Sequence, residues 1–146
     1  RWSKELVVKT AFLVTLFNDT FYVMDSETAL ARGYTDLSLI LRPDARQYPL
    51  LDHLLEFKAL SLKATGLTSV QLGVLSRDQL RQLPQVKEAL AAAETQLARY
   101  RQTLQQTYGE RLRLRTHAVV CIGLERLVIG SPYPPTASAD SILQEN

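Results

Sequence analysis

Two charged residues, Glu56 and Lys58, interrupt an otherwise apolar stretch at residues 50–60, which reads LLDHLLEFKAL. Such a dense apolar run is typical of a β-strand that is covered on both faces. Alternate side chains of a strand point to the same face, so Glu56 and Lys58 share one. Because burying a charge is costly unless it is paired or binds a metal, this strand predicts a polar cluster inside the fold.

The elements around this strand predict one domain, a mixed α/β or an α+β sandwich, in which helices flank a mixed sheet. The 146 residues are enough for one domain with one hydrophobic core. Apolar residues spaced alternately by four and three predict the long second helix, which Pro84 opens and Gly109 follows. We expect helices at 3–18 and 84–108, a helical turn from Ser76, strands at 20–30, 34–42, 50–60, 112–122 and 127–129, and irregular structure at 61–75.

Composition excludes several other classes of protein. Hydrophobic residues make up 46% and charged residues 22%, which argues against a disordered chain, a collagen or a coiled-coil rod. The single cysteine, Cys121, allows neither an intrachain disulfide nor a thiolate zinc site, and so favours a reducing, cytoplasmic location. A net charge of +2 is too small to diagnose nucleic-acid binding, and no apolar run approaches the length of a membrane span. The start lacks a methionine, so we expect a piece of a longer polypeptide.

A second carboxylate, Asp36, interrupts the preceding strand. Leu37, Leu39 and Leu41 take one face of that strand, which puts Asp36 on the other face with Ser38. Two neighbouring strands can therefore bring Asp36, Glu56 and Lys58 into one cluster. Paired carboxylates suit Mg²⁺, and a nearby lysine can orient a water molecule or stabilise charge on a phosphate.

These residues resemble the motif of the PD-(D/E)XK nuclease superfamily: Asp36, then nineteen residues, then Glu56-Phe57-Lys58. The order of helix, three strands, helix and strand also resembles that superfamily's core. The closer resemblance is to the nuclease-like domain at the C-terminus of AAA-ATPase-like bacterial proteins. Its further positions match Glu5 in the first helix, the segment Gly33-Tyr34-Thr35-Asp36, and Gln96 with Tyr100 in the long helix.

The resemblance implies a restriction-endonuclease-like core with αβββαβ order in residues 1–130, followed by a flexible tail at 131–146. It implies that Asp36 and Glu56 bind Mg²⁺ or Mn²⁺, that Lys58 positions the attacking water, and that Glu5 adds a contact. Gln96 and Tyr100 would border the substrate. The implied activity is hydrolysis of phosphodiester bonds, in DNA above all. The implied partners are DNA, an ATPase-like N-terminal region of the same polypeptide and a second copy in a homodimer, with no membrane.

Other interpretations of the same residues stay open. The chain can be a catalytically inactive module with this fold, acting as a binding or regulatory appendage of the ATPase-containing protein. It can also be a structural domain in which Asp36 and Glu56 point apart. Thr35 stands where the motif has proline. Glu5 can serve only the helix start, Gln96 can be a solvated helix position, and Tyr100 can be a core residue.

Overall fold

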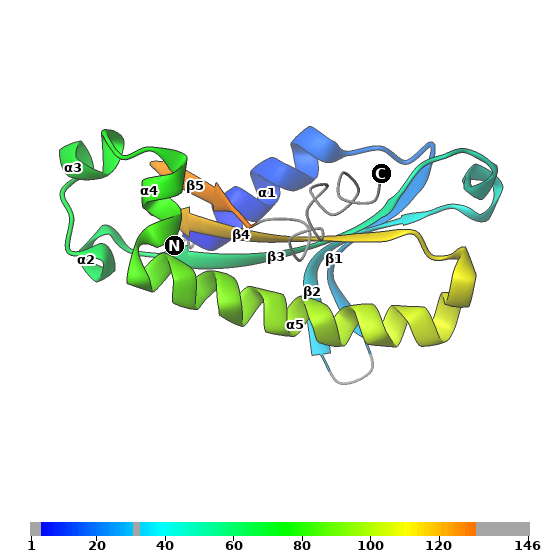
Figure 1. The fold of residues 1–146 in the computed structure, drawn as a ribbon. Coiled ribbons are helices and arrows are strands. Elements are labelled where there is room, and N and C mark those ends of the chain that lie inside the picture. The colour runs from blue at the N-terminus through cyan, green and yellow to red at the C-terminus, as the bar shows by residue number, and fades with distance from the viewer. Residues whose placement is uncertain (1–3, 31–32, 131–146) are drawn as a thin grey trace, which may run out of the picture.

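A five-stranded mixed sheet forms the centre of the protein (Figure 1). The computed structural model describes the backbone of residues 4–30 and 33–130, and the side chains of 6–25 and 37–130. The strands are β1 (Tyr22–Leu30), β2 (Gly33–Leu41), β3 (Asp52–Leu60), β4 (Leu114–Ile122) and β5 (Arg126–Ile129). They lie in the order β1-β2-β3-β4-β5, with β3 and β4 parallel and the other neighbours antiparallel. The expected mixed sheet is therefore confirmed.

Two helices cover opposite faces of the sheet (Figure 1). Helix α1 (Lys4–Leu16) packs on the face that carries Leu55 and Phe57, and its Phe12 ring meets the Phe57 ring edge-on at 5.2 Å between centroids. Helix α5 (Pro84–Tyr108) packs on the face that carries Leu54. The central strand β3 is thus covered on both faces, as its apolar sequence predicts.

Helix α5 follows from its sequence pattern. Its buried residues recur every three or four positions, so one stripe faces the sheet. Pro84 occupies the first turn, where it costs no hydrogen bond, and Gly109 ends the helix at a φ of 59°. At 25 residues the helix is about 37 Å long and connects the parallel strands β3 and β4. The buried residues of α5 are Val86, Ala89, Ala93, Leu97, Tyr100 and Leu104.

The segment between β3 and α5 is more regular than the sequence analysis expects. Residues 61–75 contain the short helices α2 (Leu62–Thr65) and α3 (Ser69–Gly73), and α4 (Arg77–Gln82) follows. A capping box of Thr68 and Gln71 starts α3, just as a box of Ser76 and Gln79 starts α4 at the predicted turn. Leu72 of α3 is fully buried in a cluster with Leu80, and this long-range packing stabilises helices too short to be stable alone.

Smaller differences concern the ends of elements. Strand β3 begins at Asp52 rather than at residue 50, and β4 begins at Leu114 rather than at 112. The 3₁₀ turns η1 (Pro43–Gln47) and η2 (Gly109–Arg111) precede these two strands. Residues 31 and 32, between the first two predicted strands, and the predicted tail at 131–146 lie outside the described residues. None of the helices in the described part of the chain has the length and apolar character needed to cross a membrane.

Candidate functional site

Glu56, Lys58 and Gln96 meet on the α5 face of the sheet. The Nζ atom of Lys58 donates a hydrogen bond of 2.7 Å to Oε1 of Gln96. The same Nζ lies 3.9 Å from Oε1 of Glu56. Strand alternation puts the two β3 residues on one face, and α5 brings Gln96 over them from the opposite layer. The structure therefore brings together three of the predicted site residues.

Burial differs sharply within this cluster. The Glu56 side chain is 6% exposed, whereas the Lys58 side chain is 30% exposed. Ala118 lies beside Glu56 in the register of the parallel pair β3–β4, and Leu54 precedes it on the same face, so its surroundings are largely apolar. A carboxylate in such a place needs a compensating cation. Among the described side chains, Lys58 provides this cation. Its amine lies at the limit of ion-pair distance from Glu56 and can be reached from solvent.

Tyr100 lies one helical turn beyond Gln96. It is 7% exposed and packs in the cluster that includes Leu54 and Ala118. Residues four apart are neighbours on a helix surface, so Tyr100 continues the line that starts at Gln96. This position suits a core residue and also a residue that borders the substrate, because Tyr100 is part of the core and adjoins the polar cluster along α5.

Asp36 and Glu5 are described only in their backbones. The recorded antiparallel pairs of β2 and β3 run from Leu39 and His53 to Leu37 and Leu55. Asp36 and Glu56 are the next residues beyond that last pair on the two strands. Glu5 lies in the first turn of α1, the helix on the other face of the sheet. The side chains of both residues lie outside the described part, so their predicted roles stay predictions.

The described residues supply part of a metal-binding donor set. Among the side chains that the structure describes, no three from histidine, cysteine, aspartate and glutamate come together. Among the described side chains, Glu56 contributes a carboxylate to the cluster. Carboxylate oxygens are the ligands that Mg²⁺ prefers. A second carboxylate at this place would have to come from Asp36. The donor chemistry therefore fits a hard cation only if both predicted carboxylates take part.

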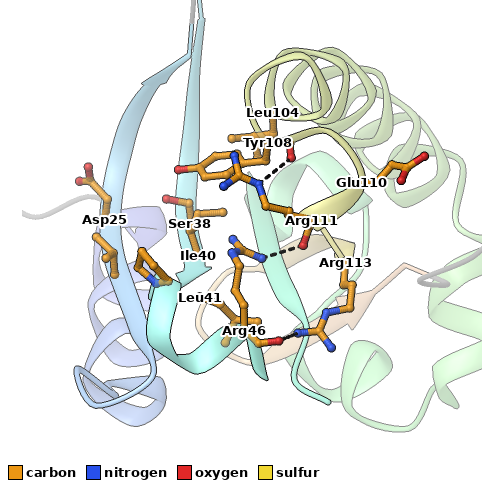
Figure 2. A pocket seen from close by; sticks show the side chains of 12 residues that line it. Asp25, Ser38, Ile40, Leu41, Arg46, Leu104, Tyr108, Glu110, Arg111 and Arg113 are labelled. Atoms are coloured by element: carbon orange, nitrogen blue, oxygen red, sulfur yellow. Dashed lines mark hydrogen bonds between the residues drawn. The ribbon is translucent and has the colours of Figure 1, made fainter. Parts of the chain in front are cut away.

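A pocket of about 620 Å³ opens on the same face of the sheet, between the β1–β2 hairpin and the end of α5 (Figure 2). Local sequence patterns do not predict this pocket. The sequence offers only a weak sign of it. Arg111 and Arg113 stand two residues apart directly after the long helix, and Arg46 lies far away in the sequence. The residues lining the pocket are Val23, Asp25, Ser38, Ile40, Leu41, Pro43, Arg46, Leu104, Tyr108, Glu110, Arg111 and Arg113.

A fully buried carboxylate, Asp52, organises one wall of this pocket. Both of its oxygens accept hydrogen bonds of 3.1 Å from the guanidinium of Arg46. They also accept bonds from the backbone N–H of Leu41 at 2.7 Å and of Arg113 at 3.1 Å. Arg46 in turn lies over the ring of Tyr108, with Cζ 5.4 Å from the ring centroid. This arrangement gives Arg46 a structural role at the base of the pocket.

The opposite face of the sheet carries a pair of histidines. Nδ1 of His53 lies 3.0 Å from Nε2 of His117, and the two rings stack with centroids 5.2 Å apart. They line a cavity of about 390 Å³ together with Phe12 and Tyr22. Burial lowers the pKa of both histidines, and each lies on the α1 side, away from Glu56 and Lys58. The two rings thus supply each other with a hydrogen-bond partner.

Comparison with known proteins adds no relative to this picture. No family model matches the chain, and it matches neither a curated protein nor a solved structure. The side chains of this chain and their geometry are therefore the basis for inferring its function.

Proposed function

We propose that this chain is a metal-dependent nuclease domain that hydrolyses phosphodiester bonds of DNA. The observation that supports it is the position of the Lys58 amine, 3.9 Å from the buried carboxylate of Glu56 and 2.7 Å from the amide oxygen of Gln96. A glutamate, a lysine and a helix-borne glutamine are the residue types that the motif requires at these positions. They come from β3 and α5, which lie in different layers and are 38 residues apart at the Lys58–Gln96 contact.

The order of the elements supports the finer fold in this proposal. The described chain runs α1, β1, β2, β3, α5, β4, with the short helices α2 to α4 inserted before α5. This is the αβββαβ order of a restriction-endonuclease-like core. The same proposal includes DNA and an ATPase-like region of the same polypeptide as partners, a homodimer, and a cytoplasmic location.

Each residue has a distinct role in the proposed reaction. Asp36 and Glu56 would hold Mg²⁺ or Mn²⁺, which when bound polarises a phosphate oxygen and lowers the pKa of a water molecule. Lys58 carries a positive charge at a solvent-reachable position, so it can stabilise negative charge that develops on the phosphate. Gln96 accepts a hydrogen bond from the Lys58 amine and thereby fixes its direction. Tyr100 supports this part of α5 from the core.

A cleavage assay with fluorescently labelled DNA tests the proposal. Both single-stranded and duplex DNA are incubated with Mg²⁺, with Mn²⁺ or with EDTA. We expect cleavage with either metal and none with EDTA. Asp36→Asn, Glu56→Gln and Lys58→Ala should each reduce the rate by at least about 100-fold, since each removes a charge from the site.

Lys63→Ala is the matched control, because Lys63 is an exposed lysine of the short helix α2. It should cleave at the wild-type rate, and all variants should show cooperative unfolding. If the wild-type protein binds DNA but cleaves neither DNA nor RNA with either metal, the inactive binding module is the correct interpretation. Wild-type cleavage that persists in Lys58→Ala would also contradict the proposed site.

A further inference from the structure

The arginine-lined pocket and the Glu56–Lys58–Gln96 cluster lie along one line of α5. Gln96, Tyr100, Leu104 and Tyr108 follow one another at intervals of four residues, so each is the neighbour of the next on the helix surface. Gln96 contacts Lys58 at one end of this line, and Leu104 and Tyr108 line the pocket at the other. Twelve residues separate Gln96 from Tyr108, which is about 18 Å of helix.

The pocket combines an aromatic ring, an apolar lining and a guanidinium. Tyr108 lies at the middle of the view in Figure 2, with Ser38 and Ile40 of β2 across the pocket from it. Val23, Leu41 and Leu104 add further apolar surface. A cavity of about 620 Å³ is within the usual size of small-ligand sites. Its chemistry matches a nucleotide, which has a flat apolar base and an anionic phosphate.

Arg111 is the cation of the pocket that is available to a ligand. The carboxylate of Asp52 neutralises Arg46, and Arg113 donates to the carbonyl oxygens of Arg46 and Tyr48. Arg111 is exposed, and its Nε makes only a long 3.5 Å bond to the carbonyl oxygen of Tyr108. Among the side chains that the structure describes, none forms an ion pair with Arg111. Its two terminal nitrogens have no hydrogen-bond partner among the described residues, so they are available to bind an anion beside Tyr108.

The two acidic residues that line the pocket, Asp25 and Glu110, do not point toward Arg111. Figure 2 shows the carboxylate of Glu110 directed away from Tyr108 and Arg46. Asp25 lies on β1, at the far wall of the pocket, with its carboxylate turned away from Arg111. The region around Tyr108 and Arg111 is therefore the part of the pocket suited to a phosphate.

We propose that this pocket binds one unpaired nucleotide of the DNA strand that the cluster cleaves. The base packs against Tyr108 and the apolar lining, and a phosphate pairs with Arg111. Proteins bind single strands in this way, with bases on aromatic rings and phosphates on basic side chains, whereas a paired base would first have to leave its stack. Along the helix, the pocket lies about 18 Å from the cluster. At 3.4 Å per stacked nucleotide, about five nucleotides would span this distance between the pocket and the scissile phosphate. The inference rests on the proposed nuclease function.

Binding measured in EDTA tests the pocket without any cleavage. The probe is a fluorescein-labelled oligothymidylate of twelve nucleotides, followed by fluorescence anisotropy. We expect Tyr108→Ala and Arg111→Ala each to weaken binding about tenfold, as loss of one stacked base or one phosphate contact does. Arg77→Ala, at an exposed arginine of α4, should change the affinity less than twofold. Equal affinity of the wild type for the same length of duplex DNA would overturn the proposal.

Cleavage of substrates of two lengths separates this inference from the nuclease proposal. Arg111→Ala should raise KM about tenfold for the twelve-nucleotide strand and leave it unchanged for a three-nucleotide strand that cannot reach the pocket. If the wild type cleaves both strands and Arg111→Ala has no effect that depends on length, the pocket proposal is wrong and the nuclease proposal stands. If nothing is cleaved but Arg111→Ala still weakens binding, the nuclease proposal is wrong and the pocket stands as a single-strand site.

Discussion

At the scale of single residues, Asp52 shows how a buried charge can organise a fold. Its side chain is fully buried, yet each oxygen accepts more than one hydrogen bond, from Arg46 and from the backbone of Leu41 and Arg113. These partners lie at the end of β2, in the 3₁₀ turn η1 and directly before β4. Charge-assisted hydrogen bonds of this kind are among the stronger polar contacts in proteins. Asp52 therefore joins three segments at the point where β3 begins.

The histidine pair gives a prediction about pH at the same scale. Burial lowers the pKa of His53 below its ordinary 6.5, and Arg115 lowers it further while Asp52 opposes the shift. Burial also lowers the pKa of His117, with added contributions from His53 and Arg115. As the pH falls below 6.5, the unfolded chain takes up protons that the folded pair resists, so the free energy of unfolding falls.

Urea unfolding between pH 8 and pH 5 measures this effect. The wild-type midpoint should stay level above about pH 7 and then decrease toward pH 5. In the double variant His53→Gln/His117→Gln the decrease should be smaller, because both titrating groups are gone. Equal slopes for the two proteins would show that the pair contributes nothing to the pH dependence. The double variant should still cleave DNA, because both histidines lie on the face opposite Glu56.

At the scale of elements, the end of α5 is set by one glycine. Gly109 has a φ of 59° and a ψ of −137°, a backbone conformation that glycine adopts and other residues rarely do. A Cβ added at Gly109 would meet nothing within 4 Å, so replacing it would introduce backbone strain and no clash. The turn that follows carries Arg111 into the pocket beside Tyr108.

Gly109→Ala should therefore lower the free energy of unfolding by about 1–2 kcal/mol. Gly73→Ala is its matched control, because Gly73 ends α3 without a positive φ and a Cβ there would also meet nothing within 4 Å. That control should leave stability unchanged or raise it slightly, since alanine restricts the unfolded chain. Urea titration of both variants decides the matter, and equal effects of the two substitutions would contradict the argument from backbone conformation.

Features that depend on neighbouring residues could be predicted from the sequence, whereas features that join distant segments could not. The covering of β3, the apolar stripe of α5 and the shared face of Glu56 and Lys58 all follow from local periodicity. The helix α3 could have been predicted as well, because Thr68 and Gln71 form the same capping box as Ser76 and Gln79. The Arg46–Asp52 network and the pocket could not, since their members come from segments about 60 residues apart. Only the tertiary fold brings those segments together.

At the scale of the whole molecule, the sheet separates two kinds of site. The α1 face carries the histidine pair in a mainly apolar cavity, and the α5 face carries the lysine cluster and the arginine-lined pocket. Both proposed DNA contacts thus lie on one face, in line along α5. A strand bound there would touch the β1–β2 hairpin, the helix and the turn after it.

Metal binding on the α5 face should be visible as a change in the stability of the whole domain. A ligand that binds only the folded state stabilises it by about 2.7 kcal/mol at a concentration 100-fold above its Kd. For a domain of 146 residues this raises Tm by several degrees. We therefore expect Mn²⁺ to raise the wild-type Tm and EDTA to reverse the rise. Lys58→Ala should keep the rise, because it retains both proposed carboxylates.

Glu56→Gln should lose the Mn²⁺ effect on Tm while folding normally, because its amide fills the same space without the negative charge that attracts the cation. Its Tm in EDTA reports on the other role of Glu56. If Glu56 served only as the structural partner of Lys58, Glu56→Gln would lower Tm equally with and without Mn²⁺, since the Lys58 amine would lose the carboxylate that lies 3.9 Å away. A Tm that does not respond to Mn²⁺ in the wild type would remove the metal from the proposal, whatever the stability of the variants.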